Sequence, residues 1–224
     1  KFKDLYSLTI KNAGIQTIGD SKFDIGSQYL RSLDLSYNEI KELLKNQFEQ
    51  LKKIEIINLS HNMIETIGSQ KIKNGYFPTL DLSHNKIKEL HKNQFNDFYP
   101  IVKIDLSHNM IETIDKDVFR DGLRSLNLNF EQSVEQHIST VDLSFNQIKI
   151  FKREWFLKSL PGLNVNANFS HNKISEFFCK DTIEKDIVLD LNLSHNQIFN
   201  SESFYECMKK FAILETLDLS FNNL

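Results

Sequence analysis

The chain has 224 residues, 40% of them hydrophobic, which is enough apolar material for one sizeable folded unit and argues against disorder. Its net charge of -3, with Lys residues scattered among Glu residues, argues against a surface for nucleic acid. No apolar run approaches the roughly 20 residues of a membrane-spanning helix, so we expect no membrane insertion within this segment. The chain starts at Lys1 without an initiator Met and stops within a repeat at Leu224, which we interpret as a processed or excised piece.

One short motif recurs along the whole chain at nearly constant spacing. Its most regular copy is residues 80–87, which read Leu-Asp-Leu-Ser-His-Asn-Lys-Ile. Successive units start 22 to 26 residues apart, except that one unit has only 15 residues. The ten units begin at Leu5, Leu30, Ile54, Phe77, Ile101, Leu123, Ile138, Asn164, Val188 and Leu214. A repeat of this length predicts a solenoid, in which each unit forms one turn and packs against its neighbours.

The alternation within the motif predicts a short strand in every unit. In the most regular copy, Leu80 and Leu82 point to one face of the strand and Asp81 points to the other. A strand of three residues is not stable alone, so each one must pair with the next at a distance of about 4.8 Å. We therefore predict an α/β solenoid with a parallel sheet of about ten short strands on its concave side and a core of Leu, Ile and Phe.

The segments that return from one strand to the next are predicted to be mostly irregular. Several carry a Phe near the nineteenth position, and these residues should form a column in the core: Phe23, Phe48, Phe95, Phe119 and Phe156. Near the C-terminus, Ser203-x-x-Glu206 reads as a capping box, and the apolar residues at 204, 207, 208 and 211 share one helical face. We expect a short convex helix there.

An Asn follows most strands, at the point where the chain turns inward and its backbone polar groups leave water. An amide both donates and accepts hydrogen bonds, so we interpret this column as structural. It consists of Asn38, Asn62, Asn85, Asn109, Asn146, Asn172, Asn196 and Asn222. Glu131 interrupts it in the unit of 15 residues.

Other columns face outward and are candidates for binding. The row between the two Leu residues of each motif contains mostly Asp and Asn, which suit a protein or glycan ligand but also belong to the ordinary form of the repeat. The position before the Asn column holds Tyr37, His61, His84, His108, Phe130, Phe145, His171, His195 and Phe221. The aromatic members are either anchors for a partner or packing for the neighbouring turn. We expect no metal or other cofactor at the His residues, because side chains on parallel strands do not converge.

The irregular zone 123–146 is the preferred position for a ligand-binding site. A break in a regular stack costs packing, so it indicates either an altered docking surface or a degenerate unit without function. The ligand-binding candidates are Lys103, Asn127, Asn129, Phe130, Glu131, Thr140, Asp142 and Phe145.

The Cys residues and acceptor sequences for N-glycosylation bear on the cellular compartment. Cys179 and Cys207 lie in the return segments of adjacent units, so they form either one disulfide or, for Cys207, a buried thiol on the apolar face of the helix. Asn58, Asn168 and Asn192 each begin an Asn-x-Ser acceptor sequence on the outward row. The same sequence arises whenever Asn replaces Asp in the motif, so the match is weak evidence for glycosylation.

With its Leu-x-x-Leu-x-Leu-x-x-Asn-x-Leu pattern and return-segment Phe, the chain resembles the leucine-rich repeat family, in the animal class with repeats near 24 residues that includes Toll-like receptor ectodomains and secreted insect immune proteins. The resemblance covers nearly all of residues 1–224 and implies a single leucine-rich repeat domain. It also implies an extracellular protein, secreted or a receptor ectodomain. The Cys-rich caps that usually close both ends are missing from the sequence, so a dimer through an uncapped end is one expectation.

We therefore predict a non-enzymatic recognition module that binds a protein or glycan through the concave face and the irregular zone, as part of an innate-immune-type receptor or secreted protein. The alternative is an intracellular protein-binding scaffold or inhibitor, which the low number of Cys residues favours. No nucleophile and base stand out from the repeat, and no Gly-rich phosphate loop is present.

Overall fold

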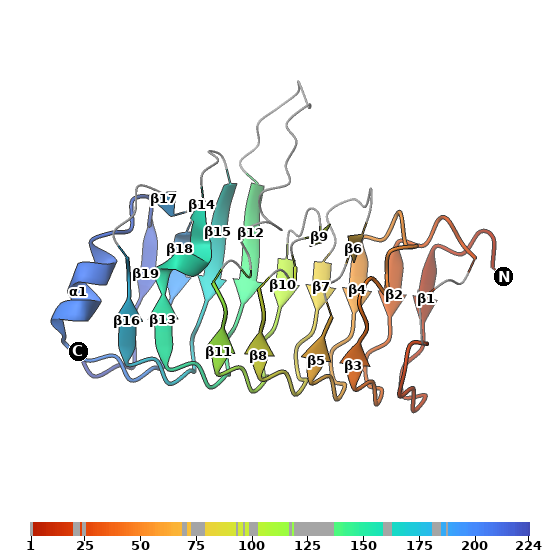
Figure 1. Ribbon diagram of the computed structural model, residues 1–224, viewed down its shortest axis with the longest axis horizontal. Helices are drawn as coiled ribbons and strands as arrows, with labels where there is room; N and C mark the ends of the chain where they lie inside the picture. The colour runs from red at the N-terminus through yellow and green to blue at the C-terminus, as the bar shows by residue number, and fades with distance from the viewer. Residues whose placement is uncertain are drawn as a thin grey trace, which may run out of the picture.

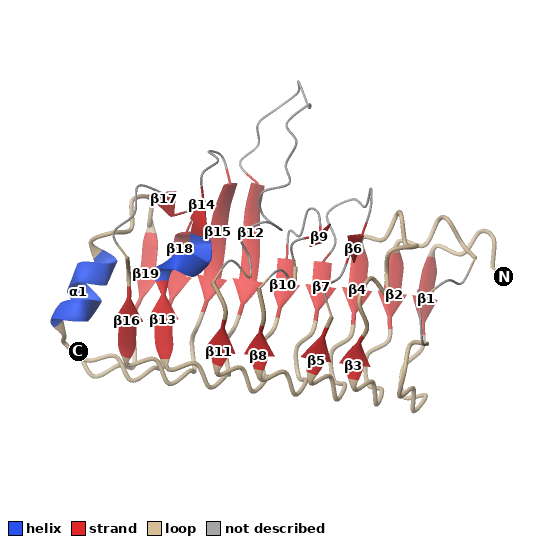
Figure 2. Ribbon diagram, viewed as in Figure 1, coloured by secondary structure: helices blue, strands red, loops and turns tan. Residues whose placement is uncertain are grey.

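The computed structural model describes most of the chain as an elongated stack of turns with the two termini at opposite ends (Figure 1). The described residues are 2–19, 23, 26–68, 71–72, 79–92, 94–95, 97–98, 103–116, 118, 137–158, 163–180, 185–186 and 188–224. Strands dominate the stack (Figure 2).

One parallel sheet of nine strands runs along the stack, with the strands in chain order. They are β1 (Ser7–Thr9), β2 (Ser32–Asp34), β4 (Ile56–Asn58), β7 (Thr79–Asp81), β10 (Lys103–Asp105), β12 (His137–Asp142), β15 (Leu163–Asn168), β18 (Val188–Asn192) and β19 (Thr216–Asp218). Each pairs in parallel with the next, and the motif positions stay in register, as in the pairing of Leu80 with Ile104. The predicted parallel sheet is therefore confirmed.

The return segments form a second, discontinuous layer. Its parallel pairs are β3 (Glu42–Leu43) with β5 (Thr66–Ile67), β6 (Lys71–Ile72) with β9 (Asp97–Phe98), β8 (Glu89–Leu90) with β11 (Thr113–Ile114), and β13 (Ile150–Lys152) with β16 (Glu176–Phe178). The pair β14 (Leu157–Lys158) and β17 (Lys185–Asp186) is antiparallel. The 3-10 helix η1 (Arg153–Phe156) and the helix α1 (Glu202–Met208) complete the layer.

The helix α1 is placed where the sequence predicts a short helix, but its first turn is capped differently. The side chain of Ser201, not Ser203, accepts a hydrogen bond from the backbone N–H of Phe204. The predicted capping box at 203–206 is therefore wrong, because Ser201 already satisfies that donor from the N-cap position. Phe204 and Cys207 are buried, as the apolar pattern predicts.

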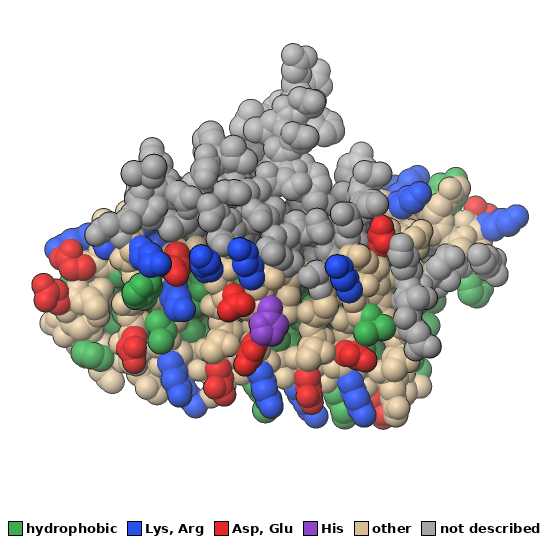
Figure 3. All heavy atoms as spheres, in the orientation of Figure 1, with side chains coloured by type: hydrophobic (Ala, Val, Ile, Leu, Met, Phe, Trp, Pro, Cys, Tyr) green, Lys and Arg blue, Asp and Glu red, His purple; other side chains and the backbone are tan. Residues whose placement is uncertain are grey.

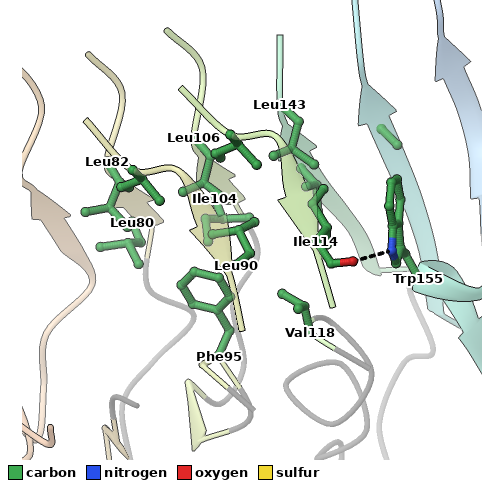
Figure 4. Close-up of a cluster of buried hydrophobic side chains, with 14 of the residues drawn as sticks. Leu80, Leu82, Leu90, Phe95, Ile104, Leu106, Ile114, Val118, Leu143 and Trp155 are labelled. Atoms are coloured by element: carbon green, nitrogen blue, oxygen red, sulfur yellow. Dashed lines mark hydrogen bonds between the residues drawn. The ribbon is translucent and has the colours of Figure 1, made fainter. Parts of the chain in front are cut away.

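The core lies between the two layers and follows the predicted columns. Leu82, Leu106 and Leu143 are completely buried, and Figure 4 shows them side by side from successive turns. Of the predicted Phe column, Phe48, Phe95 and Phe156 are buried. Phe23 is partly buried against the core, and Phe119 lies outside the described residues. Burial of each such side chain contributes roughly 1.5–3 kcal/mol, so the stack is stabilised mainly by contacts between neighbouring turns.

Residues 123–136 of the short unit lie outside the described residues. In the described sheet β10 pairs directly with β12, with Lys103 opposite Thr140, so the described strands number nine where the repeat predicts about ten. Asn146 Oδ1 accepts from the N–H of Ile111, which is the same link that joins other adjacent turns. Glu131, at the corresponding position of the short unit, has no amide with which to make this link.

Candidate interaction surfaces

The Asn column fastens each turn to the one before it. Asn85 Nδ2 donates to the carbonyl oxygens of Leu59, Leu82 and Ser83 at 3.0–3.1 Å. Its Oδ1 accepts from the backbone N–H of Ile64 at 2.9 Å. The same arrangement recurs at Asn38, Asn62, Asn109, Asn146, Asn172, Asn196 and Asn222. Because these amides are occupied within the protein, the column is structural, as predicted, and contributes no binding group.

The outward Asp and Asn row closes the turn that follows each strand. Asp81 Oδ1 accepts from the backbone N–H of Ser83 at 2.9 Å and from its hydroxyl at 2.7 Å. Asn58 makes the same two contacts with Ser60. Asp and Asn are thus interchangeable in this turn, because only Oδ1 is used. The second oxygen points to the outer surface of the sheet, which we call the sheet face; there Asp34 Oδ2 contacts Lys11 and Asp142 Oδ2 accepts from Asn168 Nδ2.

A continuous stack of rings runs along the edge where the strands end. It consists of Tyr37, His61, His84, His108, Phe145, His171, His195 and Phe221, and we call it the ring stack. Neighbouring ring centroids lie 4.1–4.3 Å apart and the ring planes are inclined by only 7–12°. The ring faces therefore pack on neighbouring turns, which is one of the two alternatives that the sequence leaves open.

The backbone explains why the rings align. Every member of the ring stack has a positive φ between 53° and 57°, so all side chains leave the turn in the same direction. The N–H of His84 donates to the carbonyl of Ser107 in the next turn at 3.0 Å, and every other member except Phe221, the last one, makes the equivalent bond. The ring edges remain accessible, since Tyr37 is 49% and Phe145 is 43% exposed.

At two positions the ring stack favours the neutral imidazole. Burial lowers the pKa of His61 and of His108 from 6.5, and the neighbouring imidazole of His84 lowers both further. Asp81 acts in the opposite direction on His61, as Asp105 does on His108. Within the described part of the chain, no group of three or more His, Cys, Asp or Glu side chains is arranged to hold a metal ion.

The sheet face contains a hollow of about 430 Å³ near its C-terminal end. It is lined by Thr140, Asn166, Ala167, Asn168, Asp190, Leu191, Asn192, Thr216, Leu217 and Asp218, which come from β12, β15, β18 and β19. Hydrogen bonds from Ser220 hold the pKa of Asp218 below 3.8, so this carboxylate is ionised at neutral pH. The hollow therefore combines a mainly apolar lining with the negative charge of Asp218.

The opposite side of the molecule has mixed charge. Figure 3 shows Lys and Arg side chains alternating with Asp and Glu side chains along the lower edge of the view. The exposed residues three positions after the Asn column, such as Lys41, Glu65 and Lys88, alternate in the same way. A surface of alternating sign has no net preference for a charged partner, in contrast to the sheet face.

The predicted site residues fall into two groups. Lys103, Thr140 and Asp142 lie on neighbouring strands of the sheet face, and Phe145 belongs to the ring stack. Asn127, Asn129, Phe130 and Glu131 lie outside the described residues. Sequence reasoning missed the hollow, although its Asp190 and Asp218 stand in columns that the repeat defines. The sequence signal is weak, since Lys103 is the single basic residue that the paired strands place in either column.

Cys179 and Cys207 form a disulfide that ties the return segment after β16 to α1. The ring of Phe177 lies 5.1 Å from that of Phe204, centroid to centroid, beside this link. Lys210 Nζ donates to the carbonyl of Cys179 at 2.7 Å. The disulfide is therefore part of a packed contact between the two segments.

The repeated turn, the Asn links and the parallel sheet together define a leucine-rich repeat solenoid. The profile of the leucine rich repeat family matches residues 3–64 and 78–132, more than half of the sequence, and the chain belongs to this family. No curated protein matches the chain. Among its described residues, no helix has the length and apolar character needed to cross a membrane.

Two solved structures have a similar fold. The leucine-rich repeat domain of APL1B has a TM-score of 0.60 and 17% identity over 97% of this chain and 64% of that chain. TLR13, solved in a TLR13-ssRNA13 complex, has a TM-score of 0.59 and 22% identity over 87% of this chain and 30% of that chain. The chain thus spans less than two-thirds of either protein, and at these identities the likeness concerns the fold alone.

Proposed function

We propose that the chain is an extracellular recognition module that binds a protein ligand through its sheet face. The observation that carries this proposal is the sheet face itself, where nine strands hold outward polar side chains in fixed rows. Ligand contacts on such a surface need little ordering of the protein, and this favours affinity. The described part of the irregular zone, residues 137–146, adds Thr140, Asp142 and Phe145 to this surface.

The disulfide between Cys179 and Cys207 favours an extracellular module over an intracellular scaffold, because disulfides persist in oxidising compartments. The resemblance of the repeat motif to Toll-like receptor ectodomains and secreted insect immune proteins supports a role in an innate-immune receptor or secreted protein. Secretion from eukaryotic cells with sugar at Asn58 is the expected behaviour. Retention inside the cell as an unmodified chain would argue for the intracellular alternative.

A pair of matched double variants tests binding through the sheet face. Ile56→Glu with Lys103→Glu adds negative charge to two exposed positions of the sheet face that make no side-chain contact needed for the turn. Ile150→Glu with Lys149→Glu makes the same changes on the second layer. Immobilised wild-type protein should capture a partner from extracellular fluid, the first variant should lose it, and the second should retain it. Loss with the second variant alone would place binding on the other layer.

A further inference from the structure

A row of alternating charge lies along one edge of the second layer. It is formed by the exposed residues that directly precede β3, β5, β8 and β11, which Figure 1 shows one after another along the stack. In chain order these residues are Lys41, Glu65, Lys88 and Glu112, and we call them the charge row. The backbone fixes their spacing, since the N–H of Glu65 donates to the carbonyl of Lys41 and the N–H of Glu112 to that of Lys88, both at 2.9 Å.

The four side chains of the charge row are not used within the described part of the chain. None of them makes an ion pair or a side-chain hydrogen bond with another described residue. Exposed charges of opposite sign in neighbouring turns do pair elsewhere, as Arg31 does with Glu55 and Lys11 with Asp34. The charge row is therefore available to charges from outside the chain.

The order of the charges makes the row complementary to itself. The sequence repeats every two turns here, since residues 38–43 return with one change at 85–90 and residues 61–67 return unchanged at 108–114. Lys consequently occupies the first and third positions of the row, and Glu occupies the second and fourth. A two-fold axis that runs parallel to the strands and passes between the second and third positions reverses this order. Each Lys of one copy then faces a Glu of the other.

We propose that the charge row docks onto the charge row of a second copy of this chain, forming a two-fold dimer. Lys88 of one copy faces Glu65 of the other, and Lys41 faces Glu112 of the other. Because the two copies contribute the same surface, each contact occurs twice and the dimer has four ion pairs. The sheet face belongs to the other layer, so the dimer does not depend on the function proposed above.

The adjoining row of side chains fits the same two-fold axis. It consists of the exposed first residues of the four strands, which are Glu42, Thr66, Glu89 and Thr113. The axis places Thr66 opposite Glu89 and Thr113 opposite Glu42, so a hydroxyl donor faces each carboxylate. A partner with charge of one sign would instead meet repulsion at every second position of the charge row, which is why a second copy fits this surface better.

The surface is small, so the dimer is weak. The two rows cover four turns, and neighbouring turns lie about 4.8 Å apart, which keeps the contact below the roughly 800 Å² per partner of a standard interface. We expect a Kd of about 0.5 mM at low ionic strength. Because exposed charges are screened by salt, the Kd should rise at least about fivefold in 0.5 M NaCl. Dilute protein is therefore monomeric.

Charge complementation tests this register, with sedimentation equilibrium of the whole chain at about 0.1–1 mM and low ionic strength as the readout. Glu65→Lys opposes Lys with Lys, and Lys88→Glu opposes Glu with Glu, so either variant alone should have a Kd raised at least about tenfold. An equimolar mixture of the two variants should dimerise like the wild-type protein, because opposite charges then face each other at both positions. The variant that carries both changes should also dimerise.

Control variants change the same charges beyond the charge row. Lys173→Glu and Glu176→Lys alter exposed residues in a later turn and should leave the Kd unchanged. The fold should tolerate all four substitutions, since the charge row already holds both Lys and Glu at equivalent positions. Circular dichroism checks this. Wild-type protein that remains monomeric at 1 mM, dimers that persist in Glu65→Lys, or a mixture that fails to dimerise would each overturn the proposal.

Crosslinking of opposite charges identifies the contacts directly. A carbodiimide joins a Lys amine to a Glu carboxylate in an equal mixture of 14N- and 15N-labelled wild-type protein, and mass spectrometry reads the isotopes of each linked peptide pair. We expect pairs of mixed isotope that link Lys88 to Glu65 and Lys41 to Glu112. Pairs of a single isotope alone would show that the charges of the row pair only within one chain, and the proposal would be wrong.

Discussion

At the scale of single residues, the Asn column is the connection on which the stack depends. Each amide satisfies backbone groups of two successive turns, as Asn85 does for Ile64, Leu59, Leu82 and Ser83. These groups are buried, so they have no water to replace a missing partner. The sequence could predict this role because the column recurs at a fixed place in a fixed motif.

Replacing one amide should therefore be costly. We expect Asn85→Ala to lower the free energy of unfolding by about 2–4 kcal/mol, because it leaves one buried N–H and three buried carbonyl groups with fewer partners. The neighbouring exposed residue provides the control, and Lys86→Ala should change stability by less than about 0.5 kcal/mol. Urea denaturation followed by circular dichroism measures both. Equal midpoints for the two variants would contradict the structural role.

The ring stack makes stability depend on pH. The pKa values of His61 and His108 are lowered from 6.5 in the folded protein, so the unfolded chain binds more protons just below that pH. The stability that the neutral imidazoles contribute above pH 6.5 is therefore lost as the pH falls below 6.5 and through their lowered pKa values in the folded protein. Asp34 and Asp218, whose pKa values are lowered from 3.8, act only in a more acidic range.

Melting temperatures measured between pH 7.5 and pH 5 test this predicted loss of stability at lower pH. We expect the melting temperature of the wild-type protein to decrease over this range. The melting temperature of the variant with His61→Phe and His108→Phe should decrease less, because the two imidazoles are gone. The fold should tolerate both changes, since Phe145 already occupies the ring stack. His91 lies outside the ring stack, so His91→Phe should behave like the wild-type protein. A steeper decrease in the double variant would contradict the assignment.

At the scale of elements, the sequence predicts what the repeat enforces and misses what departs from it. The strands at Leu33, Leu80 and Leu191 follow from alternation, since each unit must bury its leucine face against the next. The described sheet passes directly from β10 to β12, and the unit expected to start at Leu123 lies between them in sequence, outside the described residues. The register shift at Asn166 was not predictable, since it depends on pairing between two strands.

The disulfide holds α1, the α-helix among return segments that otherwise form short strands or a 3-10 helix in the described part of the chain. α1 contacts the core through Phe204 and Cys207, and the bond to Cys179 closes a loop with a sequence separation of 28. We expect Cys179→Ser with Cys207→Ser to lower stability by about 2–4 kcal/mol. Hydrogen exchange should show lost protection in α1 and β16, with little change in β2 and β4, because turns interact only with neighbours. Uniform loss along the whole chain would contradict this local role.

At the scale of the whole molecule, the solenoid separates two surfaces with different properties. The sheet face carries carboxylates that accept hydrogen bonds from hydroxyl groups, such as Asp190 from Thr216 and Asp218 from Ser220, whereas the second layer alternates in charge. The sequence could predict which positions face outward, because the repeat sets them. It could not predict where they form a hollow, since that depends on how four strands combine, or which surface binds, because the repeat pattern is carried mainly by buried residues.

The central claim is that a partner contacts the sheet face, and site-specific photo-crosslinking tests it most directly. p-Benzoylphenylalanine placed at Thr140 samples the sheet face, and the same group placed at Ile150 samples the second layer. After illumination in extracellular fluid, we expect a covalent adduct with a partner protein from position 140 and none from position 150, as detected by mass spectrometry. An adduct from position 150 alone would contradict the claim.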